Sequence, residues 1–84
     1  MVKVRTFGTF RLDTGIKELD LEVSNVKELL DAVAARINTQ SPESGVDRRS
    51  LKGCIVSVNG RQVRTSARLA DGDEVWLVPA VAGG

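Results

Sequence analysis

Three stretches of the chain alternate apolar and polar residues, as β-strands with one buried face do. They cover residues 2–7, 17–23 and 54–58. Turn-forming residues at Asp13-Thr14-Gly15 are expected to reverse the chain between the first two stretches. The N-terminal part of the chain is therefore predicted to be a β-hairpin.

The period changes after this hairpin, where apolar residues recur every three or four positions. Asn25 suits the N-cap of a helix, and Glu28 approximates a capping box with it. The residues of the apolar stripe are Val26, Leu29, Leu30, Val33 and Ile37. This stripe predicts one amphipathic helix over residues 25–37, which should lie on the apolar face of the hairpin.

The second half of the chain predicts a short hairpin and a final strand. Asn59-Gly60 is a strong hairpin signal, because a type I′ turn needs positive φ at both central residues. Residues 61–64 supply the return strand, and Asp71-Gly72 marks another tight turn. The last strand, over residues 74–78, should end at Pro79, which has no N–H to donate.

The order of elements is hairpin, helix, long loop over residues 38–52, short hairpin and final strand. A helix between two groups of strands packs across one face of a mixed sheet. We therefore predict an α+β fold of the β-grasp, ubiquitin-like type, with a mixed four- to five-stranded sheet and one main helix. The length allows a single domain over residues 1–84, with a flexible tail from about residue 79.

Composition narrows the possible functions. The formal net charge is +1, so no overall field attracts nucleic acid or an anionic membrane. The chain has no histidine and one cysteine, which excludes Ser-His and Cys-His nucleophile pairs and the usual zinc ligand sets. No segment has the pattern of a signal peptide or a membrane span. We expect a cytoplasmic module without a bound metal or cofactor.

The C-terminal segment is the most informative part of the chain. Residues 78–84 carry no charged side chain and end on Gly83-Gly84. Termini are often simply disordered, but residues without a Cβ can also thread a channel too narrow for other residues. The ionised α-carboxylate of Gly84 can attack the α-phosphate of ATP if a partner supplies the nucleotide and its metal.

The C-terminal signature resembles that of the MoaD/ThiS-like sulfur-carrier family. It consists of Leu69-Ala70-Asp71-Gly72-Asp73-Glu74-Val75 followed by residues 79–84. The helix over residues 25–37 and the turn at Val58-Asn59-Gly60 are similar to the corresponding family elements. The resemblance therefore extends over essentially the whole chain.

A second segment is similar to the molybdopterin-synthase branch of this family. Residues 7–15 follow the aromatic-x-x-Leu-Arg-Glu-x-x-Gly stretch of the small subunits, with Phe10 in place of the leucine and Leu12 in place of the acidic residue. The long loop at 38–52 also favours this branch. However, the tail has Pro79-Ala80 where many members have Pro-Pro, and it is also similar to carriers that serve cysteine biosynthesis.

The resemblance implies a reaction cycle at the last residue. An E1-like enzyme uses ATP to adenylate the Gly84 carboxylate, and a sulfurtransferase system replaces AMP with sulfur, which gives a C-terminal thiocarboxylate. The large subunit of molybdopterin synthase, or another acceptor enzyme, then takes the sulfur. Gly84 is the reactive end, Gly83 allows threading, and the carrier itself is not an enzyme.

A partner surface is predicted from the parity of the last strand. If Val75 and Leu77 face the helix, then Trp76 and Val78 lie on the open face of the sheet. Trp76 is then either partly buried under a loop or an aromatic anchor at an interface. The residues expected to contact partners are Trp76, Val78, Pro79, Val81 and Ala82.

Charge is unevenly distributed in the second half of the chain. Residues 47–68 contain six basic residues and one aspartate, a net +5, whereas residues 69–84 contain three acidic residues, a net −3. Such clusters are mostly solvated faces, and steering towards an acidic partner is the alternative. Nucleic-acid binding is disfavoured because aromatic residues do not alternate with the basic ones. Cys54 has inward parity and is expected to be structural, and Asp71 and Asp73 are expected to form the turn.

Several functions remain open at this point. The sulfur acceptor could belong to molybdopterin, cysteine or thiamine biosynthesis, and molybdenum and tungsten pathways are not distinguished. A ubiquitin-like modifier would join Gly84 to lysines of target proteins instead. An interaction domain with an incidental Gly-Gly end predicts that removal of Gly84 changes nothing.

Overall fold

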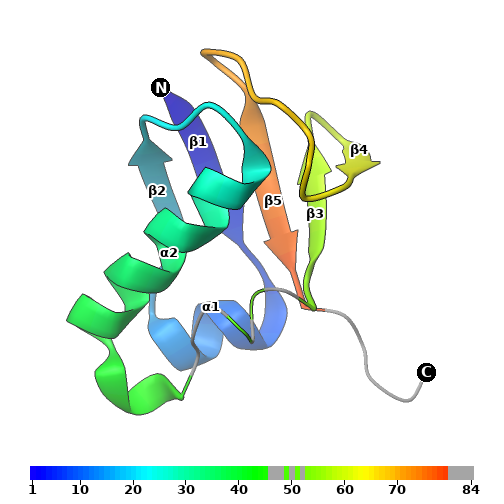
Figure 1. The fold of residues 1–84 in the computed structure, drawn as a ribbon. Helices are drawn as coiled ribbons and strands as arrows, with labels where there is room; N and C mark the ends of the chain where they lie inside the picture. Colours follow the sequence, from blue (N-terminus) through cyan, green and yellow to red (C-terminus); the bar gives the residue numbers. More distant parts are fainter. Residues whose placement is uncertain (46–48, 50, 52, 80–84) are drawn as a thin grey trace.

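The computed structural model describes residues 1–45, 49, 51 and 53–79, without the side chains of residues 9, 10, 13 and 44. One long helix lies across one face of a five-stranded sheet, whose strand order is β2-β1-β5-β3-β4 (Figure 1). The elements are β1 (Val2–Thr6), α1 (Gly8–Thr14), β2 (Glu18–Leu21), α2 (Val26–Gln40), the 3-10 turn η1 (Pro42–Ser44), β3 (Ile55–Val58), β4 (Arg61–Val63) and β5 (Glu74–Val78).

The centre of the sheet joins the two ends of the chain. Strand β1 pairs in parallel with β5, with Val4 opposite Val75, and it pairs antiparallel with β2. Strand β3 pairs antiparallel with both β5 and β4. This mixed sheet with its single long helix confirms the predicted β-grasp architecture. The predicted tail lies outside the described residues beyond Pro79.

Helix α2 begins as the capping pattern predicts. The Asn25 side chain accepts a hydrogen bond from the Glu28 backbone N–H at 2.8 Å. The Glu28 carboxylate accepts one from the Ser24 N–H, also at 2.8 Å. All members of the apolar stripe are buried against the sheet: Val26, Leu29, Leu30, Val33 and Ile37.

The predicted loop over residues 38–52 begins too early, and it contains the short helical turn η1. Helix α2 continues to Gln40, and Thr39 donates its hydroxyl to the Ala35 carbonyl at 3.0 Å. This last turn is polar, so apolar periodicity could not reveal it. Leu51 is 1% exposed and belongs to the core, although no sequence pattern surrounds it.

The predicted N-terminal turn is also wrong in form. A seven-residue helix, α1, connects β1 to β2, and it ends at Gly15 with φ 71°. Leu12 on this helix is 83% exposed, and a helix of seven residues is too short for its periodicity to be recognised from the sequence. Thr6 donates its hydroxyl to the Ile16 carbonyl, and Ser41 donates to the Thr14 carbonyl at 2.7 Å. Tertiary hydrogen bonds thus flank this connection.

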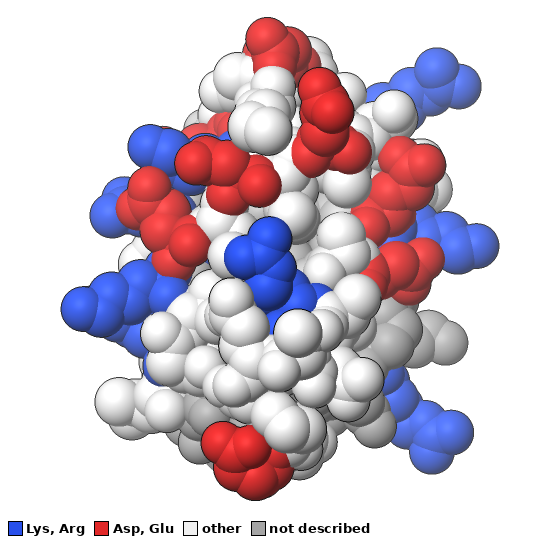
Figure 2. Space-filling model, turned by 90° about the vertical axis from the view of Figure 1, so that its left-hand side faces the viewer, with Lys and Arg blue, Asp and Glu red and all other residues white. Residues whose placement is uncertain are grey.

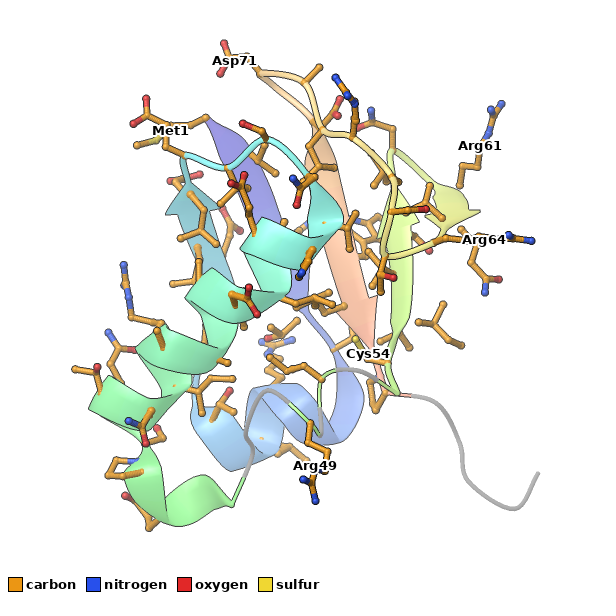
Figure 3. All side chains as sticks on the ribbon, in the orientation of Figure 1. Met1, Arg49, Cys54, Arg61, Arg64 and Asp71 are labelled. Atoms are coloured by element: carbon orange, nitrogen blue, oxygen red, sulfur yellow. The ribbon has the colours of Figure 1, made fainter. Side chains whose placement is uncertain are left out.

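The second hairpin confirms its turn prediction. Asn59 has φ 52° and Gly60 has φ 86°. The Asn59 side chain donates to Asp73 Oδ1 at 3.0 Å and accepts from the Glu74 N–H at 3.0 Å. Asp73 Oδ2 also accepts from the Ala70 N–H at 2.8 Å, which confirms its turn-forming role. Cys54 is half-buried against the core, close to the end of β5 (Figure 3).

No helix in the described ranges is both long enough and apolar enough to cross a membrane.

Candidate partner-binding site at the base of the tail

The site is the end of β5, where the C-terminal segment leaves the sheet. Val78 is the last residue of β5, and Pro79 is the last described residue. The predicted reactive end, Gly83-Gly84, and the predicted contacts Val81 and Ala82 lie outside the described residues. The structure therefore shows the base from which the tail departs.

Pro79 packs against the beginning of α1. The Phe7 backbone N–H donates to the Leu77 carbonyl at 3.2 Å, which extends the contact between β1 and β5 by one residue. The next residue, Gly8, has φ 62°, and a Cβ there would lie 3.1 Å from Pro79 Cγ and 3.5 Å from Cδ. Only glycine therefore fits this close approach without displacement.

Trp76 lies on the open face of the sheet, as strand parity predicts, and is 38% exposed. Its ring centroid is 5.3 Å from that of Phe7, with the planes tilted by 56°. Ile55 pairs with Val78 on the neighbouring strand and is also 38% exposed. These four residues, Phe7, Ile55, Trp76 and Val78, form what we call the open-face patch.

A row of charged side chains orients the tryptophan. Glu74 Oε1 accepts the indole N–H of Trp76 at 2.7 Å and lies 3.5 Å from Arg5 Nη1. Arg5 also contacts Glu18 at 3.6 Å, and Lys3 contacts Glu18 at 3.3 Å. The pKa of Glu74 is lowered, first by the hydrogen bond from the Trp76 indole and then by Arg5 and Lys3. These pairs are exposed, so they fix geometry more than they add stability.

The described residues offer little chemistry of their own. Within the described ranges, no three of the His, Cys, Asp and Glu side chains gather as metal ligands would. What the site presents is an apolar, aromatic patch beside the start of the tail. Such a patch suits binding to another protein.

Sequence reasoning identified only part of this patch. Trp76 and Val78 were predicted from the parity of the last strand. Ile55 was missed, although it alternates with the buried Val56 and so had a detectable signal. Phe7 and Gly8 were missed because their role depends on contacts with β5, which no local pattern shows.

Comparison with known proteins identifies the relatives of this chain. The model of the ThiS family matches residues 4–84, a span that includes both terminal glycines. The chain belongs to the ThiS family. A search of curated protein sequences finds no match.

Solved structures place this ThiS-family chain among ubiquitin-like sulfur carriers. It is 27% identical to a putative molybdopterin converting factor, subunit 1, from Pyrococcus furiosus, with a TM-score of 0.68 over 95% of this chain and 97% of that one. It is 30% identical to a chain of the Amycolatopsis orientalis BexX/CysO complex, with a TM-score of 0.70 over 100% of both chains. SAMP1 from Haloferax volcanii shares the fold at 22% identity, with a TM-score of 0.73 over 99% and 98% of the two chains. These matches confirm the predicted family and fold class.

The contact between Gly8 and Pro79 predicts a difference between two glycine substitutions. Gly8 and Gly15 flank α1 with similar φ values of 62° and 71°, but a Cβ at Gly15 would meet nothing within 4 Å. Gly15→Ala should therefore lower the free energy of unfolding by only about 1–2 kcal/mol, the cost of a Cβ in the left-handed backbone conformation. Gly8→Ala should lower it by at least about 1 kcal/mol more. Urea unfolding followed by the fluorescence of the single tryptophan measures both.

A double variant tests the cause of that difference. Pro79→Ala removes the Cγ and Cδ atoms that Gly8 approaches. In this background the unfolding free energies lost by Gly8→Ala and by Gly15→Ala should differ by no more than about 0.5 kcal/mol. Equal losses for the two glycines in the wild-type background contradict the proposed packing role of Gly8.

The lowered pKa of Glu74 predicts a pH-dependent change at Trp76. The folded-state pKa of Glu74 lies below the ordinary value of 4.5, so the ionised carboxylate contributes stability above that ordinary value, and this stability is lost as pH falls through the folded pKa. Trp76 emission should therefore change as the pH falls from the ordinary pKa of a glutamate through the lowered pKa of Glu74. Glu74→Gln should abolish this change, whereas Glu18→Gln, which contacts Arg5 but not the indole, should retain it. A transition that persists unchanged in Glu74→Gln contradicts the assignment.

Proposed function

We propose that this protein carries sulfur on its C-terminus, most specifically as the small subunit of molybdopterin synthase. The observation that supports this most directly is the ThiS-family match, which extends through Gly84. The similarity to a putative molybdopterin converting factor, subunit 1, favours the molybdopterin pathway. In this proposal the protein is a carrier and a subunit, and the catalytic groups belong to its partners.

The chemistry takes place at the Gly84 carboxylate in two steps. A carboxylate oxygen attacks the α-phosphate of ATP on an E1-like enzyme, which releases pyrophosphate and leaves an acyl-adenylate. Hydrosulfide supplied by a sulfurtransferase system then attacks the acyl carbon and releases AMP, which leaves a thiocarboxylate. The ATP and its metal belong to the activating enzyme, so the carrier binds no cofactor.

The open-face patch provides the docking surface in this proposal. It lies at the base of the tail, so a partner that covers Trp76 and Val78 can also receive Pro79 and the residues beyond it. Phe7 and Glu74 hold the indole in place before binding, which reduces the entropy lost when the interface forms. The BexX/CysO structure is a complex, which supports an acceptor partner for this chain as well.

A second function differs only in the acceptor. The match to the BexX/CysO complex, at 30% identity over both full chains, favours a carrier for a different sulfur acceptor. If lysine amines rather than sulfide take the activated acyl group, the protein is a modifier. Purification from the native host distinguishes these functions by the acceptor enzyme or the modified lysines that are recovered.

The activation step provides the test of the proposal. With the activating enzyme of the same host, the wild-type chain should support ATP–pyrophosphate exchange. Deletion of Gly84 should lower the exchange rate by at least about 100-fold, because the nucleophilic carboxylate is displaced by one residue. Exchange that continues at the wild-type rate without Gly84 contradicts the proposal and favours an incidental Gly-Gly end.

The same assay tests the docking surface. Trp76→Ala should raise the KM for the carrier by about 10-fold or more, with little change in kcat, because the indole contributes binding in the ground state and the transition state alike. Leu12→Ala is the matched control, since Leu12 is a large exposed apolar residue outside the patch. An unchanged KM for Trp76→Ala, or an equal effect of Leu12→Ala, contradicts the role of the patch.

A further inference from the structure

The sheet edge formed by β4 carries a pocket that the proposed function does not use. Its volume is about 320 Å³, and its lining residues are Val58, Asn59, Arg61, Val63 and Arg68. Val58 pairs with Arg61, and Val56 pairs with Val63, so these side chains share the face that α2 covers elsewhere. Figure 1 shows β3 and β4 at the end of the sheet away from α2, beside the segment that connects β4 to β5. The pocket therefore lies on the opposite face from Trp76.

The walls of the pocket are held in place by backbone hydrogen bonds. The Val26 N–H donates to the Ala67 carbonyl at 3.0 Å, and the Leu69 N–H donates to the Ser24 carbonyl at 2.8 Å. Arg68 lies between these two bonds, in an isolated β-bridge with Asn25. The segment that carries Arg68 is thus pinned to the beginning of α2, and a ligand would meet a preorganised site.

The charge around the pocket has no counterpart among the described residues. Arg61, Arg64 and Arg68 are exposed, and none of their guanidinium groups forms an ion pair within the described part of the chain. Figure 3 shows Arg61 and Arg64 projecting outward at this edge. By contrast, Lys3 and Arg5 on the open face are paired with glutamates. Arg48 and Lys52, which belong to the same basic cluster in the sequence, lie outside the described residues.

The left-hand side of the molecule in Figure 1, which Figure 2 shows face-on, can be compared with the β4 edge. That view faces the side of the molecule that carries α2 and β2, and there red and blue side chains lie interspersed (Figure 2). Other exposed basic residues, such as Lys17, Lys27 and Arg36, also form no ion pair within the described ranges, so what distinguishes the β4 edge is that its unpaired arginines gather around a pocket. Guanidinium groups without partners bind carboxylates or phosphates in charge-assisted, often bidentate contacts.

The lining of the pocket and the unpaired edge of β4 favour an acidic peptide over a small anion or a nucleic acid. Val58 and Val63 are half-buried and contribute apolar surface. The residues that line the pocket include no aromatic side chain on which a base could stack. Strand β4 is at the end of the strand order, so one of its edges is unpaired and can accept another strand.

We propose that the β4 edge is a second protein-binding surface, which takes an extended acidic segment of a partner as an added strand. Residues of that segment opposite Arg61 and Val63 share one face, so the expected pattern is acidic-x-apolar. The carboxylate pairs with Arg61 or Arg68, and the apolar side chain enters the pocket. Because this surface lies on the other face from Trp76, a partner bound here leaves the open-face patch and the base of the tail accessible.

A peptide titration tests this proposal without any activating enzyme. The probe is acetyl-Glu-Thr-Val-Thr-Glu-amide, added to the ¹⁵N-labelled full chain at low salt. Saturable amide shifts should appear at Arg61, Val63 and Arg68, with a dissociation constant near or below about 1 mM, while the Trp76 indole N–H should not shift. Arg61→Gln combined with Arg68→Gln should weaken binding by at least about 10-fold. Arg36→Gln, an exposed arginine on α2, is the matched control and should bind as the wild type does.

Several outcomes would overturn the proposal. One is the absence of saturable shifts up to about 5 mM peptide, and another is equal binding by acetyl-Lys-Thr-Val-Thr-Lys-amide. Equal binding by the double arginine variant also overturns it. If inorganic phosphate or oligothymidylate produces the same shifts at lower concentration, the edge binds small anions or nucleic acid instead. Both substituted arginines are exposed, and the spectra of the variants show directly whether the fold is retained. None of these results depends on the sulfur-carrier function.

Discussion

The parallel pairing of β1 with β5 is the constraint on which the rest of the structure depends. It places the first and last strands side by side at the centre of the sheet, with Val4 and Val75 fully buried between the sheet and α2. Parallel neighbours need a crossover connection, and here nearly the whole chain lies between them. The pairing also continues beyond β1, where the Phe7 N–H donates to Leu77. The segment after β1 therefore contacts the base of the tail, and Gly8 packs against Pro79.

This arrangement separates the two faces of the sheet by their chemistry. One face is covered by α2, except at the β4 edge, where arginines surround a small pocket. The open face combines an apolar patch with paired charges, and Glu74 connects the two because it accepts the Trp76 indole and contacts Arg5. A carrier with several partners benefits from such separation, since a partner bound at one surface leaves the other surface accessible. The tail, in this account, delivers its cargo from the boundary of the open face.

The sequence was sufficient for the features that depend on local patterns. The α2 stripe and its Asn25 cap, the positive φ values at Asn59 and Gly60, and the outward parity of Trp76 all follow from spacing and residue type. Helix α1 could not be predicted in this way, because it is only seven residues long and is flanked by tertiary hydrogen bonds such as that of Thr6. The packing of the tail base was hidden for the same reason, since it depends on residues far apart in the chain. The family resemblance added the expectation that the terminal glycines are reactive, which composition alone left open.

The proposed function requires the C-terminal carboxylate to acquire sulfur. The most direct measurement is the intact mass of the protein purified from its own host, with and without iodoacetamide. We expect a species about 16 Da heavier than the carboxylate form, because sulfur replaces oxygen in the thiocarboxylate. That species should also be alkylated once more than the single cysteine, Cys54, allows. Under conditions that preserve thioacids, a chain found only as free carboxylate, or joined through its C-terminus to lysines of other proteins, would contradict the claim.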